Sequence, residues 1–92
     1  MTDAVVSRTA TIKNQRGLHA RAAALFVKTA ARFESQVSVS KGGQTVSGSS
    51  IMGLMMLAAC IGSDISLEAE GPDAVEAMKA ICQMIEDRFD EE

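Results

Sequence analysis

The stretch QVSVSKGGQTVS, residues 36–47, carries the clearest structural signal in the chain. Val37 and Val39 alternate with polar residues, a pattern typical of a strand with one buried face. Gly42-Gly43 follows directly, and two adjacent glycines between such segments predict a tight hairpin, because hairpin turns need positive φ. We therefore expect antiparallel strands at 36–41 and 44–47, with the rest of the chain packed around this hairpin.

Two further strands and three helices are predicted outside the hairpin. Residues 5–12 are rich in β-branched side chains and residues 64–70 alternate apolar and polar positions, so both segments should be strands. Helices are expected at residues 20–33, at 51–59 and from Pro72 onward, where proline suits a first helical turn. The order β-α-β-β-α-β-α predicts an α+β open-faced sandwich, in which a four-stranded, mainly antiparallel sheet has three helices on one face.

The last helix shows an apolar stripe that should face the core. Its members recur every three to four residues: Val75, Met78, Ile81 with Cys82, Ile85 and Phe89. The acidic tail, residues 86–92, is expected to be frayed. With 92 residues and no linker segment, the chain should form one domain over residues 1–92.

The composition argues against several classes of partner. The chain has three Phe and neither Trp nor Tyr, so bases cannot stack on several aromatic rings and no nucleic-acid partner is expected. No apolar run approaches the roughly 20 residues that span a bilayer. The N-terminus lacks the pattern of a signal peptide, so we expect a cytoplasmic protein without a membrane partner. Cys60 and Cys82 form no C-x-x-C pair and should be reduced, partly buried thiols.

The only histidine, His19, lies where a strand has ended and a helix begins. The first turn of a helix has N–H groups without partners and a partial positive charge, and both attract phosphate. Arg21 adds a guanidinium with a geometry suited to phosphate oxygens. Residues 1–49 carry seven Lys/Arg and two Asp/Glu, so positive surroundings should favour the neutral, nucleophilic imidazole. These features predict a histidine that accepts and donates phosphoryl groups.

The residues alone leave other roles for His19 open. A surface histidine without a role fits the periodicity equally well. A metal site is not expected, because the chain has no second histidine and no cysteine nearby in sequence. A Ser-His-Asp or Cys-His catalyst is compatible with the composition, although no sequence typical of a nucleophile elbow is present.

Two segments resemble a known family: Gly17-Leu18-His19-Ala20-Arg21-Ala22-Ala23 and Ser49-Ser50-Ile51-Met52-Gly53-Leu54. They look like HPr, the histidine-containing phosphocarrier of the bacterial phosphoenolpyruvate-dependent phosphotransferase system, and the resemblance extends from Val5 to the last helix. It implies that enzyme I phosphorylates His19 on Nδ1 and that the group then passes to an enzyme IIA protein. Arg21 would contact the phosphoryl group, and no cofactor is implied. Most members carry proline where this chain has Ala22, so a looser start of the helix is expected.

Ser50 has an expected structural role and, by resemblance, a regulatory one. A serine directly before a helix should cap it by accepting a hydrogen bond from the first turn. In some lineages of the family, the residue that matches Ser50 is phosphorylated by a dedicated serine kinase/phosphorylase, which modulates transfer.

The helix after Ser50 has more large apolar residues than one buried face needs. Leu54 and Leu57 fit the inward stripe, and Met56 is expected to fill a gap in the core. The remaining apolar residues should form an exposed docking surface for partner proteins beside His19: Ile51, Met52 and Met55.

The leading hypothesis is a monomeric phosphocarrier with a covalent phosphohistidine intermediate, rather than a free-standing enzyme. The alternative is a non-catalytic regulatory or ligand-sensing α+β domain, because many regulatory domains share this element order. A paralogue that only regulates is disfavoured by the presence of His19. Residues 51–57 look more like the nitrogen-related branch of the family than the sugar-uptake branch.

Overall fold

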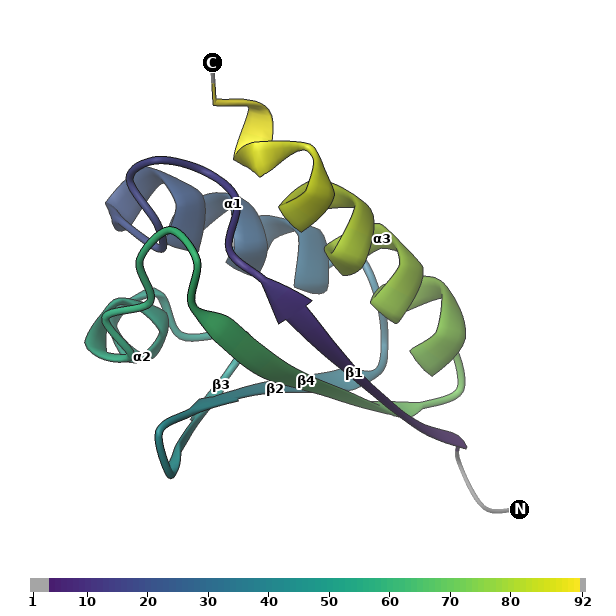
Figure 1. The fold of residues 1–92 in the computed structure, drawn as a ribbon. Coiled ribbons are helices and arrows are strands. Elements are labelled where there is room, and N and C mark those ends of the chain that lie inside the picture. The colour runs from purple at the N-terminus through teal and green to yellow at the C-terminus, as the bar shows by residue number, and fades with distance from the viewer. Residues whose placement is uncertain (1–3, 92) are drawn as a thin grey trace.

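The computed structural model describes residues 4–91, in which three helices cover one face of a four-stranded sheet (Figure 1). The strands are β1 (Ala4–Thr11), β2 (Gln36–Lys41), β3 (Gln44–Ser47) and β4 (Asp64–Gly71). The three helices are α1 (Ala20–Ala30), α2 (Ile51–Met56) and α3 (Ala74–Glu86), and a short 3₁₀ turn, η1 (Arg88–Asp90), follows α3. The sheet order is β1-β4-β2-β3, and all neighbouring strands are antiparallel. The predicted open-faced sandwich is confirmed.

The hairpin forms as the glycine pair predicts. Gly42 and Gly43 have φ of 57° and 83°, the combination that a two-residue hairpin turn requires. Val39 lies opposite Val46 in the resulting register. The hairpin therefore turns β2 toward the core and leaves β3 at the edge of the sheet.

The core lies between the inner face of the sheet and the helices. On β4, Ile65, Leu67 and Ala69 are buried, whereas the residues between them are exposed. Phe26 of α1 and Ile81 of α3 are fully buried above them. The alternation along β4 shows why the sheet can leave its second face to water: each strand contributes apolar side chains to one face only.

Both early helices end sooner than their sequences predict. Helix α1 ends at Ala30 rather than Phe33, because the N–H groups of Arg32 and Phe33 bond to carbonyls three residues back and tighten the chain into turns. Helix α2 ends at Met56 rather than at residue 59. Ala58 adopts a φ of 53° there, and the Ala59 carbonyl accepts a hydrogen bond from the Leu18 N–H at 2.9 Å. A tertiary contact thus takes the chain out of the helix.

The buried face of α3 begins one residue earlier than predicted. Val75 is 44% exposed, so its assignment to the core is wrong; Ala74 occupies the buried position instead. Met78, Ile81 and Ile85 are buried as predicted. Successive helical residues are about 100° apart, so a shift of one position is enough to move a side chain from core to solvent.

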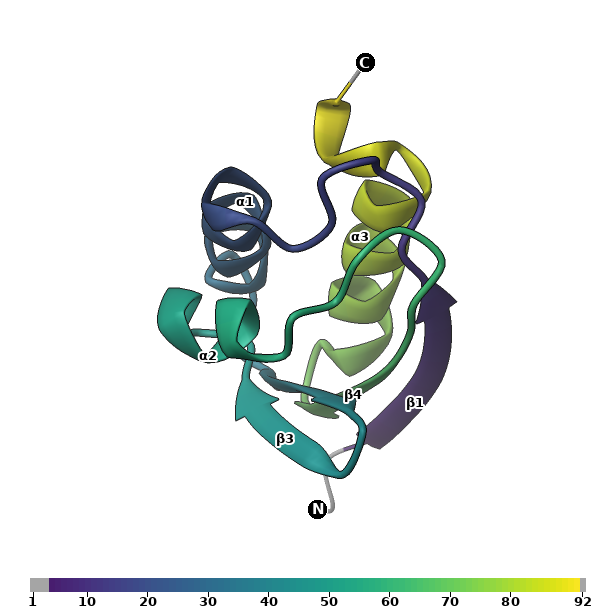
Figure 2. The ribbon, with the colours of Figure 1, turned by 60° about the vertical axis from the view of Figure 1, so that its left-hand side comes forward.

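The acidic tail is not frayed over residues 86–91, contrary to the prediction; residue 92 lies outside the described part. Arg88, Phe89 and Asp90 have φ between 52° and 59°, which makes a left-handed turn. This turn places Phe89 in the core with 3% of its surface exposed. It also directs Glu91 back toward the loop before α1, and Figure 2 shows the yellow C-terminal turn beside that purple loop. Burial of one aromatic ring anchors a segment that charge alone would leave in solvent.

Candidate functional site

His19 is the N-cap residue of α1, with φ −74° and ψ 179°. Its side chain does not cap the helix, although its carbonyl accepts the Ala23 N–H at 2.8 Å. The N–H groups of the first turn therefore donate no hydrogen bond to this side chain, which leaves them available to an anion. The predicted location of His19 between a strand and a helix is confirmed.

Gly17 holds the loop before His19 against the segment after α2. It has a φ of 65°, and a Cβ atom added here would lie 2.3 Å from the Ala59 carbonyl oxygen. The next residue, Leu18, is buried and donates its N–H to that same oxygen. A side chain at position 17 would clash with this contact, so glycine allows the loop to lie close to the chain.

Arg21 and Ala22 begin the helix beside His19. The Arg21 side chain is exposed and forms no ion pair with any of residues 4–91, so its guanidinium is free to bind an anion. Ala22 is completely buried, and α1 begins at Ala20 in spite of the missing proline. The start of the helix is therefore closely packed with alanine at this position.

The side chain of Glu91 contacts His19, which the sequence did not reveal. Its Oε2 atom lies 2.7 Å from Nε2 of His19 and 3.2 Å from Nδ2 of Asn14. Its Oε1 atom accepts the backbone N–H of Arg16 at 3.3 Å. Desolvation raises the pKa of the Glu91 carboxyl, but the hydrogen bonds from these three groups outweigh it and hold this pKa below its usual value. The surroundings of His19 are therefore less positive than local composition predicted.

Asn14 links the tail to the loop. Its side chain is completely buried, and Nδ2 donates to the Gly17 carbonyl at 2.7 Å as well as to Glu91. Within residues 4–91 its Oδ1 atom has no hydrogen-bond partner. The sequence did not predict this role, because nothing local indicates that Asn14 will meet a residue 77 positions later.

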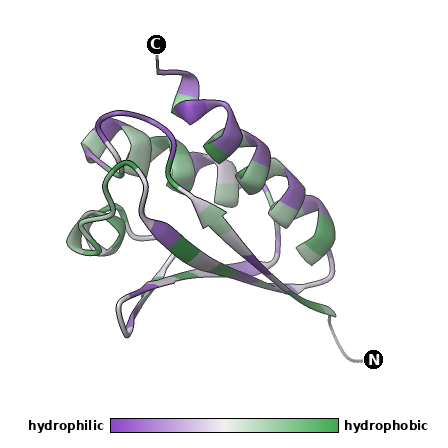
Figure 3. Cartoon of the chain, in the orientation of Figure 1, coloured by the Kyte–Doolittle hydropathy of each residue, from purple (hydrophilic) through white to green (hydrophobic). Residues whose placement is uncertain are grey.

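Helix α2 exposes an apolar surface, and it is coloured hydrophobic along almost its whole length (Figure 3). Leu54 and Leu57 are buried as predicted. Met56 is the last residue of α2 and is 66% exposed, so its prediction as a core residue is wrong. The α2 patch comprises Ile51, Met52, Met55 and Met56, which are 41%, 70%, 39% and 66% exposed.

Ser50 caps α2 as predicted. Its Oγ atom accepts the Gly53 N–H at 3.0 Å.

The expectation for the cysteines is half correct. Cys82 is half-buried, and burial raises the pKa of its thiol, but Cys60 is exposed because it lies in the loop after α2 rather than in a helix.

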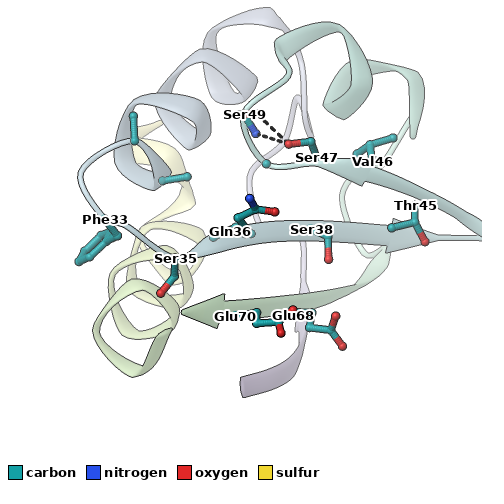
Figure 4. A pocket seen from close by; sticks show the side chains of 14 residues that line it. Phe33, Ser35, Gln36, Ser38, Thr45, Val46, Ser47, Ser49, Glu68 and Glu70 are labelled. Atoms are coloured by element: carbon teal, nitrogen blue, oxygen red, sulfur yellow. Dashed lines mark hydrogen bonds between the residues drawn. The ribbon is translucent and has the colours of Figure 1, made fainter. Parts of the chain in front are cut away.

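An open hollow of about 580 Å³ lies beside β2 and β3 (Figure 4). Ala30 and Ala31 line it, at the C-terminal end of α1, whereas His19 is at the N-terminal end. An eleven-residue helix is about 16 Å long, so the hollow does not belong to the His19 site.

Among residues 4–91, no three His, Cys, Asp or Glu side chains are grouped to hold a metal ion. None of the described helices is both long and apolar enough to cross a bilayer.

Comparison with known proteins identifies the family. The family described as the PTS HPr component phosphorylation site matches residues 6–87. The chain is 51% identical over 87 residues to the phosphocarrier protein HPr of Cupriavidus necator, which covers 95% of this chain and 98% of the relative. The crystal structure of HPr-C-His from Thermoanaerobacter tengcongensis superposes with a TM-score of 0.90 at 49% identity, covering 95% of this chain and 98% of that one. The chain therefore belongs to the HPr family of phosphocarrier proteins of the phosphotransferase system.

One similar structure bears on the oligomeric state. It is the crystal structure of an HPr dimer from Thermoanaerobacter tengcongensis, with a TM-score of 0.76 and 51% identity over 87% of this chain and 92% of that one. The monomeric state expected for the present chain thus stays a prediction.

Proposed function

We propose that His19 carries the phosphoryl group and that Nδ1 is the atom that binds it. The observation that supports this most strongly is the position of the imidazole: His19 is the N-cap residue of α1, and the Nε2 atom of its ring contacts Glu91 at 2.7 Å. Nδ1 is then the nitrogen available to a donor. The N–H groups of the first turn and the guanidinium of Arg21, two positions after the N-cap, would bind the phosphoryl oxygens.

The transfer step is a substitution at phosphorus. The lone pair on Nδ1 forms the new N–P bond while the bond between phosphorus and the donor atom breaks, and its electron pair leaves with the donor. The second transfer reverses these roles, with Nδ1 as the leaving atom. Positive charge from Arg21 and the helix terminus stabilises the charge on the phosphoryl oxygens in both directions.

Enzyme I is the proposed donor protein and an enzyme IIA protein the proposed acceptor. The α2 patch supports this, because its apolar side chains are exposed and the segment after α2 is held against the loop before His19. The contact is the hydrogen bond from the Leu18 N–H to the Ala59 carbonyl. Methionine adapts to different partner surfaces, which suits a carrier that must bind two proteins in turn. Such interfaces are small, so each partner can leave quickly.

For Ser50 we propose a secondary regulatory role through phosphorylation by a serine kinase/phosphorylase. Its Oγ atom already accepts the Gly53 N–H, and phosphoryl oxygens can replace it as acceptors at the helix start. The added negative charge beside the α2 patch would repel an acidic partner without unfolding the helix. Ser50→Asp should therefore slow transfer while Ser50→Ala leaves it near wild type, and equal rates in both variants would contradict this role.

The experiment that tests the proposed function is intact-mass analysis after incubation with phosphoenolpyruvate and enzyme I. The expected result is the gain of one phosphate that is lost in mild acid, survives base and is absent from His19→Ala. No gain in the presence of an active enzyme I, or an equal gain in His19→Ala, would overturn the assignment.

A further inference from the structure

We propose that Glu91 is a positioning residue for the transfer reaction: its carboxylate keeps the proton of the neutral His19 imidazole on Nε2 and so leaves the lone pair on Nδ1. This inference rests on the proposed role of His19, but it concerns a residue that lies 72 positions away in the chain. It assigns a function to a C-terminal segment that charge and composition mark as unstructured.

The geometry of the contact defines which nitrogen is a donor. A carboxylate can only accept hydrogen bonds, so at a separation of 2.7 Å Nε2 of His19 must carry the proton. Both side chains are largely covered, with 19% and 20% of their surfaces exposed. Water therefore competes less for this hydrogen bond than for one on the open surface.

Three other features hold the carboxylate in place. Asn14 and the backbone N–H of Arg16 donate to it, which fixes both of its oxygens. The Glu91 N–H bonds to the Arg88 carbonyl at 2.9 Å. Phe89 anchors the turn in the core. Consecutive residues with positive φ are unfavourable outside glycine, so the buried ring and the hydrogen-bonded carboxylate together offset the strain of the left-handed turn.

The chemical consequence appears when the N–P bond forms. As Nδ1 donates its lone pair to phosphorus, the ring retains the Nε2 proton and becomes positively charged. The carboxylate of Glu91 lies against that proton and stabilises the charge, and no proton needs to leave. When the phosphoryl group departs, the electron pair returns to Nδ1 and the ring becomes neutral again.

The first test is NMR of the unphosphorylated protein with 15N-labelled histidine, in which the single histidine gives one pair of ring signals. The spectrum, recorded over a range of pH, reports which nitrogen of the neutral ring carries the proton. The wild type should show Nδ1 as the unprotonated nitrogen. Glu91→Ala should lower the fraction of the Nε2–H form. Glu91→Gln should lower it further, because the amide N–H₂ can donate to Nε2.

The second readout is the rate of phosphorylation by phosphoenolpyruvate and enzyme I. Glu91→Ala should lower it by about tenfold, a modest loss because a free imidazole also populates the same tautomer. Glu91→Asp should restore most of the rate and the tautomer ratio. The matched control is Asp90→Asn, which removes the same charge one residue away; the Asp90 side chain is exposed and makes no hydrogen bond within residues 4–91.

The outcomes separate this inference from the proposed function. The positioning role would be overturned if Glu91→Ala had the same ratio of Nε2–H to Nδ1–H imidazole as the Asp90→Asn control. It would also be overturned if this ratio changed while the phosphorylation rate did not. In both cases His19 would still take up phosphate. Absence of phosphorylation in the wild type would instead contradict the function of His19, and the NMR result on the tautomer would stand independently.

Discussion

At the scale of single residues, Arg21 is the cation proposed to bind a phosphoryl group on His19. It follows the N-cap by two positions, its side chain is exposed, and no carboxylate of residues 4–91 pairs with it. A free guanidinium can make two parallel hydrogen bonds to phosphate oxygens, which an ammonium cannot.

Replacement of Arg21 should affect transfer and not stability. Arg21→Ala should slow phosphorylation by roughly 10- to 100-fold, because it removes a charge-assisted hydrogen bond at the reacting group. Arg21→Lys should retain part of the rate, since it keeps the charge without the fork. Initial rates measure this, with urea unfolding as the control for the fold. Wild-type rates in Arg21→Ala would exclude this residue from the site.

Gly17→Ala should destabilise the protein through a clash as well as through backbone strain. The new Cβ would lie 2.3 Å from the Ala59 oxygen. Gly42→Ala is the matched control, because its φ is also positive but no atom lies within 4 Å of its Cβ position. Left-handed strain alone costs about 1–2 kcal/mol per residue, so Gly42→Ala should lose about that much in urea unfolding and Gly17→Ala clearly more. Equal losses would show that the loop simply moves aside.

The residue scale also shows how far the site could be predicted. The placement of His19 at the start of α1, with Arg21 two positions later, depends on local sequence and was predicted correctly. The partners of Gly17 and His19 come from Ala59 and Glu91, which are brought close only by the fold. In the sequence, Phe89 indicated that the acidic tail could pack on the core, since it continues the apolar stripe of the last helix, and its ring is indeed buried. The many charged residues around Phe89 instead favoured the interpretation that the tail is frayed.

At the scale of elements, the α2 patch is the surface proposed to dock partner proteins. A six-residue helix with only Leu54 buried contributes little to the core. Its exposed apolar residues instead form a surface that a partner can cover.

Met52→Asp should weaken transfer without unfolding the domain. Met52 is 70% exposed, so stability should change by less than about 0.5 kcal/mol. The negative charge should raise the KM for enzyme I by about tenfold, as expected for a central contact. Val75→Asp is the control: it places the same charge on an exposed apolar position in the first turn of α3. An equal KM in the two variants would remove the patch from the docking surface.

Elements whose character depends on periodicity were predicted correctly, whereas their ends were not. The alternation in β2 and β4 and the stripe of α3 reflect burial on one face, which the residue pattern encodes directly. The end of α2 depends on the Leu18–Ala59 hydrogen bond, and a contact between distant segments leaves no trace in the local pattern. The same reason explains why Met56 was assigned to the core.

At the scale of the whole molecule, carboxylates from the acidic second half of the chain fasten segments of the basic first half. Glu86 pairs with Lys13 at 2.6 Å, and Glu91 contacts His19. Asp73 accepts the N–H groups of Glu34 and Ser35 at 3.0 Å and 2.9 Å. The fold therefore brings acidic side chains of the second half of the chain into contact with residues of the first half.

Asp73 should make stability depend on pH in the acid range. Hydrogen bonds, first from the Ser35 side chain and then from the Glu34 N–H, lower its pKa in the folded protein. A carboxyl with a lowered folded pKa stabilises the fold above its unfolded pKa of about 3.9, and this contribution is lost as the pH falls through the folded pKa. Asp73→Asn should therefore unfold at lower urea concentration at neutral pH, with a difference that shrinks as the pH drops toward 3. A pH-independent difference would show that ionisation of Asp73 does not contribute.

The most direct test of phosphoryl transfer through His19 is 15N and 31P NMR of the histidine-labelled protein after reaction with phosphoenolpyruvate and enzyme I. With one histidine in the chain, the coupled nitrogen can be assigned without ambiguity. Coupling of phosphorus to Nδ1, with Nε2 still protonated, is the expected result. Coupling to Nε2, or a phosphorylated protein with no phosphorus bound to either ring nitrogen, would contradict it.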